Sequence, residues 1–373
     1  MVKTNTFNIS FYVLDGSGNQ VDMATPDTLE SMTLSEFSGG LIPVGTIIFL
    51  FKDKDYIRPL NEKNLCILHI ELEGNKYSVD YRCRIVSSQI EQKGKNMFRV
   101  ITTICGDYVR FFNSNRTRFF NRSSSIGAIR SVLEDNDIKL STDIRISNDI
   151  QNWVQPNCSD SVFVASTLSS MNLDGESPFY ALLFSNEALI LSSKYLHDSE
   201  SITCGDSLGM LNYIEVSDMI QDTMKVNKFA GYGLSAIEVN LNKEEFNEIE
   251  ELPNTETFIT SDKKHVVDPT ISPKYVGALF KTDNHHENFY KAKLFNKVNS
   301  SVATSFRLKV VIKDIPQIKI FTKLRLFIPD VNNPKEQNYQ LSGDYIVLSK
   351  TVKVSGQDMF VELILGRQSI NYK

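Results

Sequence analysis

Several features are scarce or missing in this chain, and each absence excludes a class of protein. There are only five cysteines, without any Cys-x-x-Cys spacing: Cys66, Cys83, Cys105, Cys158 and Cys204. This pattern argues against a disulfide framework or a zinc site and favours buried thiols in a reduced compartment. The N-terminus has no apolar segment of the secretory kind. The longest clearly apolar run, Ile47–Phe51, is far shorter than the ~20 residues of a membrane span. We therefore expect a soluble protein, made in a cytoplasm, with no membrane partner.

The motifs of common enzyme classes are also missing. The chain has no Gly-x-Ser-x-Gly elbow, no His-Glu-x-x-His pair and no Walker loop. Asp135-Asn136-Asp137 lacks the glycine and glutamate that an EF-hand loop needs. The sequence therefore predicts no enzyme: no catalytic residue, no cofactor or cofactor-binding residue, and no metal ligand. A glycosidase needs only two well-placed carboxylates, which a single sequence does not reveal, so a hydrolase stays an open alternative.

Two short segments resemble binding motifs only weakly. The stretch Gly231–Ala236 fits Gly-x-Gly-x-x-Ala, but a strand follows it where a dinucleotide site requires a helix. We interpret it as a glycine-mediated bend. His285-His286-Glu287 is the densest group of metal-capable side chains. Neighbouring residues on a helix do not face each other, so we expect a solvated helix start. Of the other histidines, we expect His69 on a strand surface, and His197 and His265 in loops without partners.

Composition favours a folded, multidomain chain. With 373 residues, 41% of them hydrophobic, two or three domains with real cores are expected. The net charge of −5 is too small to indicate a general polyanion binder. Alternating or continuous apolar patterns predict short strands over the first ~105 residues, which is typical of a barrel or sandwich. These strands are Phe7–Leu14, Leu29–Phe37, Gly45–Phe51, Leu65–Leu72, Ser78–Ile85 and Met97–Ile104.

The pattern changes near Asn113 to a mixture of helices and strands. Serines at Ser123–Ser125 and Ser159 are good N-caps for two apolar-faced helices. Further on, an acidic stretch from Glu244 to Asp268 is predicted to be exposed. The remaining expected elements are a hairpin of Phe179–Phe184 and Ala188–Ser192, a strand at Ala236–Leu241, a helix over His285–Asn299, and strands at Phe306–Ile312, Lys319–Ile328 and within Tyr345–Gly366.

A short internal match links the two ends of the chain. Gly94–Phe98 reads Gly-Lys-Asn-Met-Phe, and Gly356–Phe360 reads Gly-Gln-Asp-Met-Phe. Each segment joins two apolar strands, so the match predicts one β-domain built twice. The alternative is chance, because glycine beside Asn or Asp is the commonest hairpin chemistry. Residue-by-residue alignment sets Val100 against Glu362, so the polar positions fall on opposite faces of the sheet in the two copies. Either a bulge intervenes or the match is coincidental.

The order of these elements resembles a known family: the baseplate hub proteins of contractile phage tails, with the related hub domains of VgrG and late-control D proteins. Phe7–Ile104 looks like the first tube domain, and Ser159–Ser192 like the inserted middle domain. Ala236–Leu241 together with His285–Gly366 looks like a second tube domain split by an insertion. The resemblance implies an α+β, mainly β fold with two similar antiparallel β-barrel domains. Its boundaries are 1–112, 113–210, 211–243 with 284–373, and an acidic insertion at 244–283.

The resemblance also implies a role and partners. Three subunits of such proteins form a ring that adapts the six-fold tail tube to the three-fold central spike. Expected partners are the chain itself as a homotrimer, the tail tube or tube-initiator protein and a separate spike polypeptide. The tape-measure and baseplate wedge proteins are further partners. We expect no specific nucleic-acid binding and a location in the virion tail baseplate, assembled in the host cytoplasm.

Two other functions stay open as alternatives. One is a distal tail or receptor-binding adaptor, and the other is a cell-wall or polysaccharide hydrolase with its site in the middle domain. Ten basic residues between Lys281 and Arg325 form a further candidate surface, which we expect to face a lumen or a neighbour's acidic surface. They are Lys281, Lys291, Lys293, Lys297, Arg307, Lys309, Lys313, Lys319, Lys323 and Arg325.

Overall fold

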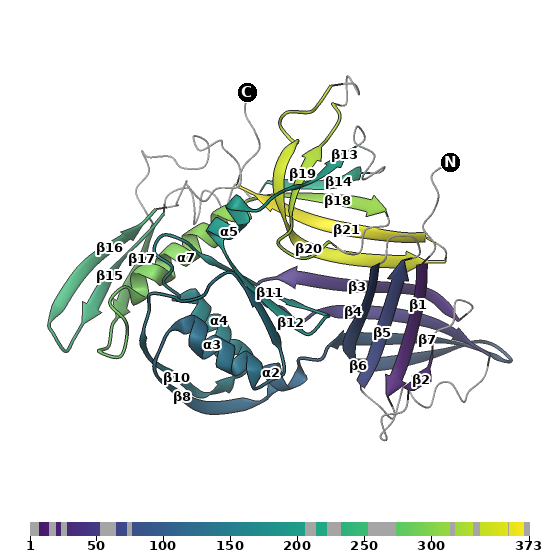
Figure 1. The fold of residues 1–373 in the computed structure, drawn as a ribbon, viewed down its shortest axis with the longest axis horizontal. Helices are drawn as coiled ribbons and strands as arrows, with labels where there is room; N and C mark the ends of the chain where they lie inside the picture. The colour runs from purple at the N-terminus through teal and green to yellow at the C-terminus, as the bar shows by residue number, and fades with distance from the viewer. Residues whose placement is uncertain are drawn as a thin grey trace.

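The structure is a computed structural model. It describes residues 7–14, 20–23, 28–52, 65–72, 77–205, 214–221, 233–252, 274–313, 318–330, 336–356 and 358–368. Strands dominate and a few helices gather on one side (Figure 1), so the predicted α+β, mainly β class is confirmed. The N-terminal part forms β1 (Phe7–Leu14), β2 (Gln20–Asp22), β3 (Leu29–Ser38), β4 (Val44–Phe51), β5 (Leu65–Leu72), β6 (Tyr77–Gly94) and β7 (Met97–Gly106).

The rest of the chain follows in two parts. The middle region comprises α2 (Val109–Asn113), β8 (Asn115–Ser123), α3 (Ser125–Glu134), β9 (Lys139–Thr142), β10 (Gln151–Ser159), α4 (Asp160–Ser169), β11 (Pro178–Leu183), β12 (Glu187–Ser192) and α5 (Ser193–Asp198). The C-terminal part comprises β13 (Ile202–Gly205), β14 (Ile214–Gln221), β15 (Leu234–Asn240), β16 (Glu245–Glu251), β17 (Lys274–Phe280), α7 (Phe289–Ala303), β18 (Phe306–Lys313), β19 (Lys323–Phe327), β20 (Gly343–Ser355) and β21 (Asp358–Arg367).

One large sheet runs through both ends of the chain. Its strand order is β14-β18-β21-β20-β3-β4-β7-β6-β5-β1-β2. In Figure 1 the yellow C-terminal strands lie directly beside the purple N-terminal ones. We call the part formed by β1–β7 the N-terminal half-sheet, and the part formed by β13, β14 and β18–β21 the C-terminal half-sheet. Among the described residues neither half closes into a barrel on its own, because β3 and β20 pair and make the two halves continuous.

The two half-sheets repeat one strand order. In the N-terminal half the neighbours run β3-β4-β7-β6-β5, and in the C-terminal half they run β14-β18-β21-β20-β19. Taken along the chain, the order of these strands is the same in both halves, and each of these neighbouring pairs is antiparallel. The long strands β6 and β20 also share one irregularity, a shift in the pairing register. Their pairing register shifts between Ile85 and Ser87 in β6, and between Val347 and Ser349 in β20.

The register corrects the alignment of the two hairpins. Thr103 pairs across the shift in β6, and Ile364 pairs across the shift in β20. Matching these two residues sets Val100 against Val361, and both are fully buried. The mismatch of pleat faces seen in the sequence disappears, because a second register shift between Gln92 and Gly94 adds one residue before the first hairpin turn. The sequence match of the two Met-Phe pairs is therefore one position away from the alignment that the strand pairing gives.

One predicted strand lies in a different sheet. Ala236–Leu241 was expected in the second barrel, but β15 pairs with β16 and β17 in a separate three-stranded sheet. That prediction is wrong, and β14 takes the position instead through its pairing with β18. The three-stranded sheet packs on α7 through Leu234, Ala236, Leu294 and Val298. β15, β16, β17 and α7 thus form one insertion between β14 and β18, seen at the left of Figure 1.

The middle region has its own core and well-capped helices. The side chain of Ser124 accepts from the Gly127 N–H at the start of α3, and Ser159 accepts from the Val162 N–H at the start of α4. Both predicted caps are confirmed. Each satisfies a backbone donor that the first helical turn leaves open. The β11–β12 hairpin also forms as predicted. The β8–β10 ribbon was not predicted from the sequence.

Buried carboxylates fix the shape of the middle region. Asp160 is fully buried and accepts from Arg118 at 3.0 Å, Asn136 at 2.7 Å and Gln155 at 2.8 Å. Asp149 is also fully buried, and it accepts from the N–H groups of Ser125 and Asn172. Because a buried carboxylate is tolerated only when paired and hydrogen-bonded, these contacts tie β8, β10, α3 and the loop after α4 into one unit.

Candidate assembly interface

The three parts of the large fold meet at β3. On one side β3 pairs with β4, and on the other it pairs with β20 along Ser31–Phe37. Near its end it also pairs with β11 of the middle region. We call the β3–β20 pairing the seam. Because one strand edge holds the two half-sheets together, the seam shows how a strand of one half docks on the edge of the other.

A buried ion pair lies in the seam. Lys350 Nζ is 2.7 Å from Glu36 Oε2, and both side chains are nearly inaccessible. The other oxygen of Glu36 accepts from the Phe184 N–H at 2.9 Å, just beyond β11. One carboxylate therefore binds a group from each of the other two parts. Next to it the hydroxyls of Ser35 and Thr351 lie 2.9 Å apart. Removing one partner of such a pair leaves a buried charge, which costs about 3–5 kcal/mol.

In the N-terminal half, no described strand covers the equivalent edge. In β20, residues 343–346 pair with β19 and residues 349–355 continue along the same edge with β3. In β6, residues 77–84 pair with β5. Within the part of the chain that the structure describes, residues 87–94 of β6 pair with β7 alone. Ile90, which corresponds to the buried Val352 of β20, is 44% exposed.

In the C-terminal half, a second strand edge is unpaired among the described residues. β14 corresponds to β3, because each is the strand beside β4 or its counterpart β18. Of the strands that the structure describes, only β18 pairs with β14, which ends the sheet. Among the described strands, the β6 and β14 edges are thus both unpaired at positions that the repeat makes equivalent to β20 and β3. By the internal repeat these two edges would be the two sides of a second seam. Open edges of this length are normally covered in functional proteins.

The repeat predicts how the two open edges would pair. In the seam Thr351 lies opposite Ser35, Lys350 opposite Glu36 and Val352 opposite Leu34. Carried through the shared register, Gln89 would lie opposite Ile220, Ser88 opposite Gln221 and Ile90 opposite Met219. The buried ion pair of the seam is replaced by two neutral residues. A second seam of this kind would bury no charge pair at that position, so it avoids the desolvation penalty of buried ions.

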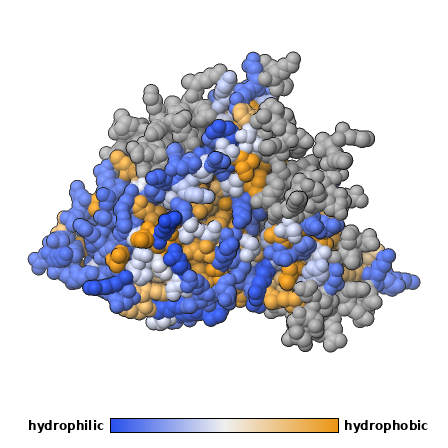
Figure 2. Space-filling view, in the orientation of Figure 1, coloured by the Kyte–Doolittle hydropathy of each residue, from blue (hydrophilic) through white to orange (hydrophobic). Residues whose placement is uncertain are grey.

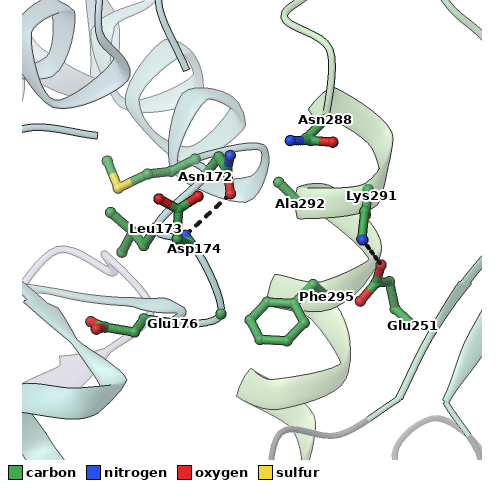
Figure 3. Close-up of a pocket in the computed structure, with 11 residues that line it drawn as sticks. Asn172, Leu173, Asp174, Glu176, Glu251, Asn288, Lys291, Ala292 and Phe295 are labelled. Atoms are coloured by element: carbon green, nitrogen blue, oxygen red, sulfur yellow. Dashed lines mark hydrogen bonds and ion pairs between the residues drawn. The ribbon is translucent and has the colours of Figure 1, made fainter. Parts of the chain in front are cut away.

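A cavity between the middle region and α7 bears on the hydrolase alternative. It has a volume of about 310 Å³ and is lined by Asp174, Glu176 and Glu251. Lys291 Nζ is 3.8 Å from a Glu251 oxygen, while burial raises the pKa of Glu251. In Figure 3 Glu251 turns toward Lys291, and Glu176 points away from Phe295. These lining carboxyl groups do not face one another across a common space, as a glycosidase pair does.

The histidine pair is not the solvated helix start that the sequence predicted, and that expectation is wrong. α7 begins after it, at Phe289. His286 is buried: its N–H donates to Gln151 Oε1 at 2.7 Å, and its Nε2 is 3.2 Å from the Ser170 carbonyl. Nε2 therefore carries the proton. Burial lowers the pKa of His286. The His285 ring stacks on Phe289 with the centroids 4.0 Å apart.

The other weak candidates have structural roles. Gly233 has a positive φ of 73°, and a Cβ there would lie 2.3 Å from the Glu251 carbonyl oxygen, in keeping with a bend; Gly231 lies outside the described residues. His69 Nδ1 is 2.6 Å from Asp80 on the next strand. His197 was expected in a loop without a partner, but it lies in α5, 2.8 Å from Asp198. His265 and the side chain of Cys204 lie outside the described residues.

The remaining cysteines are free thiols. Cys66, Cys83 and Cys105 are buried and Cys158 is half-buried. Burial raises the pKa of Cys83 well above its ordinary value. Among the described residues no group of three or more His, Cys, Asp or Glu side chains could hold a metal ion. No described helix has both the length and the apolar character that crossing a membrane requires.

Half of the ten basic residues are paired within the chain. The pairs are Lys281 with Glu238, Lys291 with Glu251, Lys309 with Glu362, Lys319 with Glu187 and Arg325 with Asp344. Three others, Lys293, Lys297 and Arg307, line one groove. Whether the basic segment faces a lumen or a neighbour's acidic surface stays a prediction. The face shown in Figure 2 is mixed, with small hydrophobic groups among hydrophilic ones.

These features define a fold class: two half-sheets with one strand order, a middle α+β region and an insertion. No protein-family model and no curated protein matches the chain. Solved structures do match over nearly its whole length, and they show that the chain has the fold of phage tail proteins.

Three solved structures are similar to this chain over 97% or more of its length. The tail protein from Neisseria meningitidis MC58 has a TM-score of 0.62 at 10% identity, covering 97% of each chain. The 43 kDa tail protein of prophage MuSo2 from Shewanella oneidensis has a TM-score of 0.60 at 9% identity, again covering 97% of each. A chain of the Francisella PdpA–VgrG complex has a TM-score of 0.53 at 8% identity, covering 100% of this chain and 60% of that one. The predicted resemblance to the hub and VgrG fold is thus confirmed at the level of fold.

Proposed function

We propose that this chain is a non-enzymatic structural subunit of a phage or phage-like tail baseplate. Three copies would form a hub ring that adapts the six-fold tail tube to the three-fold central spike. The tube or tube-initiator protein and the spike would be its direct partners, with the tape-measure and wedge proteins at its margins. Its place would be the virion tail.

One observation carries this proposal: within the described part of the chain, the internal repeat leaves one edge unpaired in each half-sheet, on β6 and on β14. The β6 edge of one copy and the β14 edge of the next can pair as β20 and β3 pair inside the chain. Repeated around three copies, this contact gives six similar half-sheets in a closed ring. A closed ring would leave neither of these two edges open. The symmetry then accounts for both neighbours, since six half-sheets meet a six-fold tube and three chains meet a three-fold spike.

The proposal keeps the expected domain division with two changes. A first domain spans 1–112, and the middle domain begins at 113 and ends before β13. The second tube domain then begins with β13, which pairs with β19, and the insertion includes β15 as well as 244–283 and α7. The adaptor alternative would not require two half-sheets with the same strand order. The hydrolase alternative would require facing carboxylates, and the lining groups of the Figure 3 cavity turn apart.

Native mass spectrometry tests the ring directly. We expect three copies for the wild-type chain. Ile90→Asp adds a charge to the open β6 edge and is expected to give monomers. Ile146→Asp is the matched control, because Ile146 is 74% exposed in the middle region, away from both edges. A wild-type chain that stays monomeric at high concentration, alone and with tube protein, would rule out the ring.

A further inference from the structure

The insertion exposes an apolar row on the face of its sheet that points away from α7. Ala236 and Ile249 pack toward α7, so the alternate residues of β15 and β16 lie on the outer face. There Phe246 of β16 and Phe280 of β17 flank Val239 of β15 in one cross-strand row. Phe246 is 69% exposed and Phe280 is 58% exposed. Apolar side chains that gather in one exposed place, rather than singly, mark a binding surface.

Carboxylates accompany this apolar row. Glu248 and Glu250 lie on the same outer face as Phe246, because each is a further two residues along β16. Both are exposed, and neither has an ion pair among the described residues. Tyr275 of β17, 57% exposed, lies across from Ser235 on this face. The outer face therefore combines exposed rings with negative charge that the described strands do not neutralise.

This chemistry argues against several kinds of occupant. A nucleic acid could stack bases on the exposed rings, but its phosphates would then lie beside Glu248 and Glu250. An anionic membrane surface is repelled for the same reason. A saccharide needs hydrogen-bonding side chains, whereas Ile237, Val239 and Ala278 at the centre of the face have none. The face instead fits a polypeptide surface that carries apolar side chains and positive charge.

The β8–β10 ribbon of the middle region exposes a second apolar row. Its inner face carries Phe120 and Trp153, which pack in the core of the middle region. On the opposite face Phe119 lies directly across from Val154, and the two are 62% and 52% exposed. Ile150, just before β10 and four residues from Val154, is 65% exposed. The ribbon thus offers apolar side chains to a partner, as the insertion sheet does.

The charge of the ribbon is opposite to that of the insertion sheet. Neither β8 nor β10 contains a carboxylate, while β8 contains three arginines. Arg116 and Arg118 pair with Asp160 inside the middle region. Arg122 is exposed next to the register shift of the ribbon, and it has no ion pair among the described residues. Arg122 therefore provides a cation for a carboxylate of another surface.

The order of the chain links each surface to one of the two unpaired edges. The chain enters the insertion after β14, and it enters the ribbon through α2 after β7, which pairs with β6. In the proposed ring, β14 of one copy meets β6 of the next. The insertion of the first copy and the ribbon of the second then belong to the two sides of one subunit boundary.

We propose that the outer face of β15–β17 in one copy binds the outer face of the β8–β10 ribbon in the next copy. Two apolar rows would cover each other, with Arg122 set against Glu248 and Glu250. Binding of the acidic face to the same face of another copy would instead set carboxylates against carboxylates. The inference rests on the proposed ring and adds a second contact between its subunits, made by two different surfaces.

Cysteine cross-linking tests this contact. All variants carry Cys158→Ser, which removes the half-buried native thiol of β10. Oxidation of Phe119→Cys/Phe246→Cys rings is expected to give reducible dimers and trimers on a denaturing gel. Each single variant should give less than a tenth of this product, because a contact between different surfaces does not set a residue against its own copy. Tyr195→Cys/Phe246→Cys is the matched control, since Tyr195 is 49% exposed in α5, outside the ribbon.

Charge exchange gives a second readout. Arg122→Glu and Glu248→Lys/Glu250→Lys are each expected to weaken ring assembly at least fivefold, as measured by mass photometry at low salt, where surface charges are least screened. The chain with all three substitutions should recover most of this loss. Lys194→Glu is the control for Arg122→Glu, because Lys194 is exposed and lies outside the ribbon.

The outcomes separate this contact from the ring itself. If the wild-type ring is intact but Phe119→Cys/Phe246→Cys does not cross-link, or the charge exchange brings no recovery, the two faces do not meet and the inference is wrong. Binding of the wild-type chain to insoluble cell-wall polysaccharide that Phe246→Asp abolishes would assign the sheet face to a saccharide and also overturn it. These results leave the proposed function standing. An absent wild-type ring contradicts both.

Discussion

The two half-sheets of this molecule have the same strand order but differ at one edge. In the N-terminal half the edge of β3 is covered by β20, while in the C-terminal half the corresponding edge of β14 ends the described sheet. The covered edge carries a buried ion pair, and the repeat sets neutral Ser88 and Gln221 at the matching positions. Where an edge is covered within the chain, both members of a charge pair are buried together as the chain folds. In the proposed ring the second edge would meet another subunit only after folding, and neutral residues there leave no buried charge unpaired beforehand.

The largest expected effect comes from breaking the covered edge. Lys350→Ala leaves Glu36 buried without its cation, so the free energy of unfolding is expected to fall by about 3–5 kcal/mol. Glu36→Gln/Lys350→Met removes both charges and is expected to cost much less. Urea unfolding followed by circular dichroism measures both. Asp344→Asn is the control, because its partner Arg325 is exposed and such pairs contribute at most about 1 kcal/mol. A loss in Lys350→Ala no larger than in this control would contradict the role assigned to the seam.

A second substitution tests whether the middle region unfolds separately from the two half-sheets. Asp160→Ala removes the buried acceptor of Arg118, Asn136 and Gln155. We expect a loss of about 2–4 kcal/mol that is confined to the middle region, because unpaired buried donors carry their full desolvation penalty. Trp153 is the only tryptophan and lies in this region, so its emission reports it selectively. Simultaneous loss of the β-sheet signal would show that the regions do not unfold separately.

Packing inside the N-terminal half gives a smaller effect with a close control. A Cβ added at Gly45 would lie 2.7 Å from Leu34 Cδ2 and 2.9 Å from the Thr33 carbonyl, on the strand that forms the seam. Gly45→Ala is expected to cost about 1–3 kcal/mol through overpacking. At the tip of the same half-sheet, a Cβ on Gly94 meets nothing within 4 Å. Gly94→Ala should leave the urea midpoint unchanged, and equal losses at the two sites would contradict this account.

The smallest effect is a pH dependence where the insertion meets the middle region. Burial lowers the pKa of His286 below its ordinary 6.5, and burial also lowers the pKa of His285. The unfolded chain therefore binds more protons, and stability should fall as pH drops through about 6.5 toward the lower folded pKa. His286→Gln is expected to reduce the dependence of the free energy of unfolding on pH. The dependence that remains would come from His285. Trp153 emission against urea at pH 7.5 and 5.5 measures it, because Phe289 lies 6.5 Å from Trp153. An unchanged pH dependence would contradict it.

Local patterns in the sequence predicted most of the N-terminal half. Alternation identified the buried faces of β1 and β5, where Phe11 and Leu68 are fully buried. Serine caps located α3 and α4. β14 was missed because a register shift between Val216 and Asp218 interrupts its alternation. The short match between the two hairpins was misaligned for the same reason, since an extra residue lies between Gln92 and Gly94.

The candidate interface could not be found from the sequence. Glu36 and Lys350 look like ordinary surface charges in their own strands, and only the pairing of β3 with β20 buries them together. The open edges follow from which strands pair, and that is a property of the whole sheet. His286 was misread for a related reason, because the groups that bury it come from Gln151 and Ser170, far away in the chain.

Disulfide cross-linking of the two open edges tests the central claim most directly. Ser35→Cys/Thr351→Cys is the internal reference, since the native hydroxyls lie 2.9 Å apart across the seam. Gln89→Cys/Ile220→Cys introduces the pair that the repeat makes equivalent. On oxidation the reference should remain a single chain on a denaturing gel, whereas the second pair should give reducible dimers and trimers. A Gln89→Cys/Ile220→Cys chain that oxidises only within itself, or not at all, while the reference forms its bond, would contradict the account.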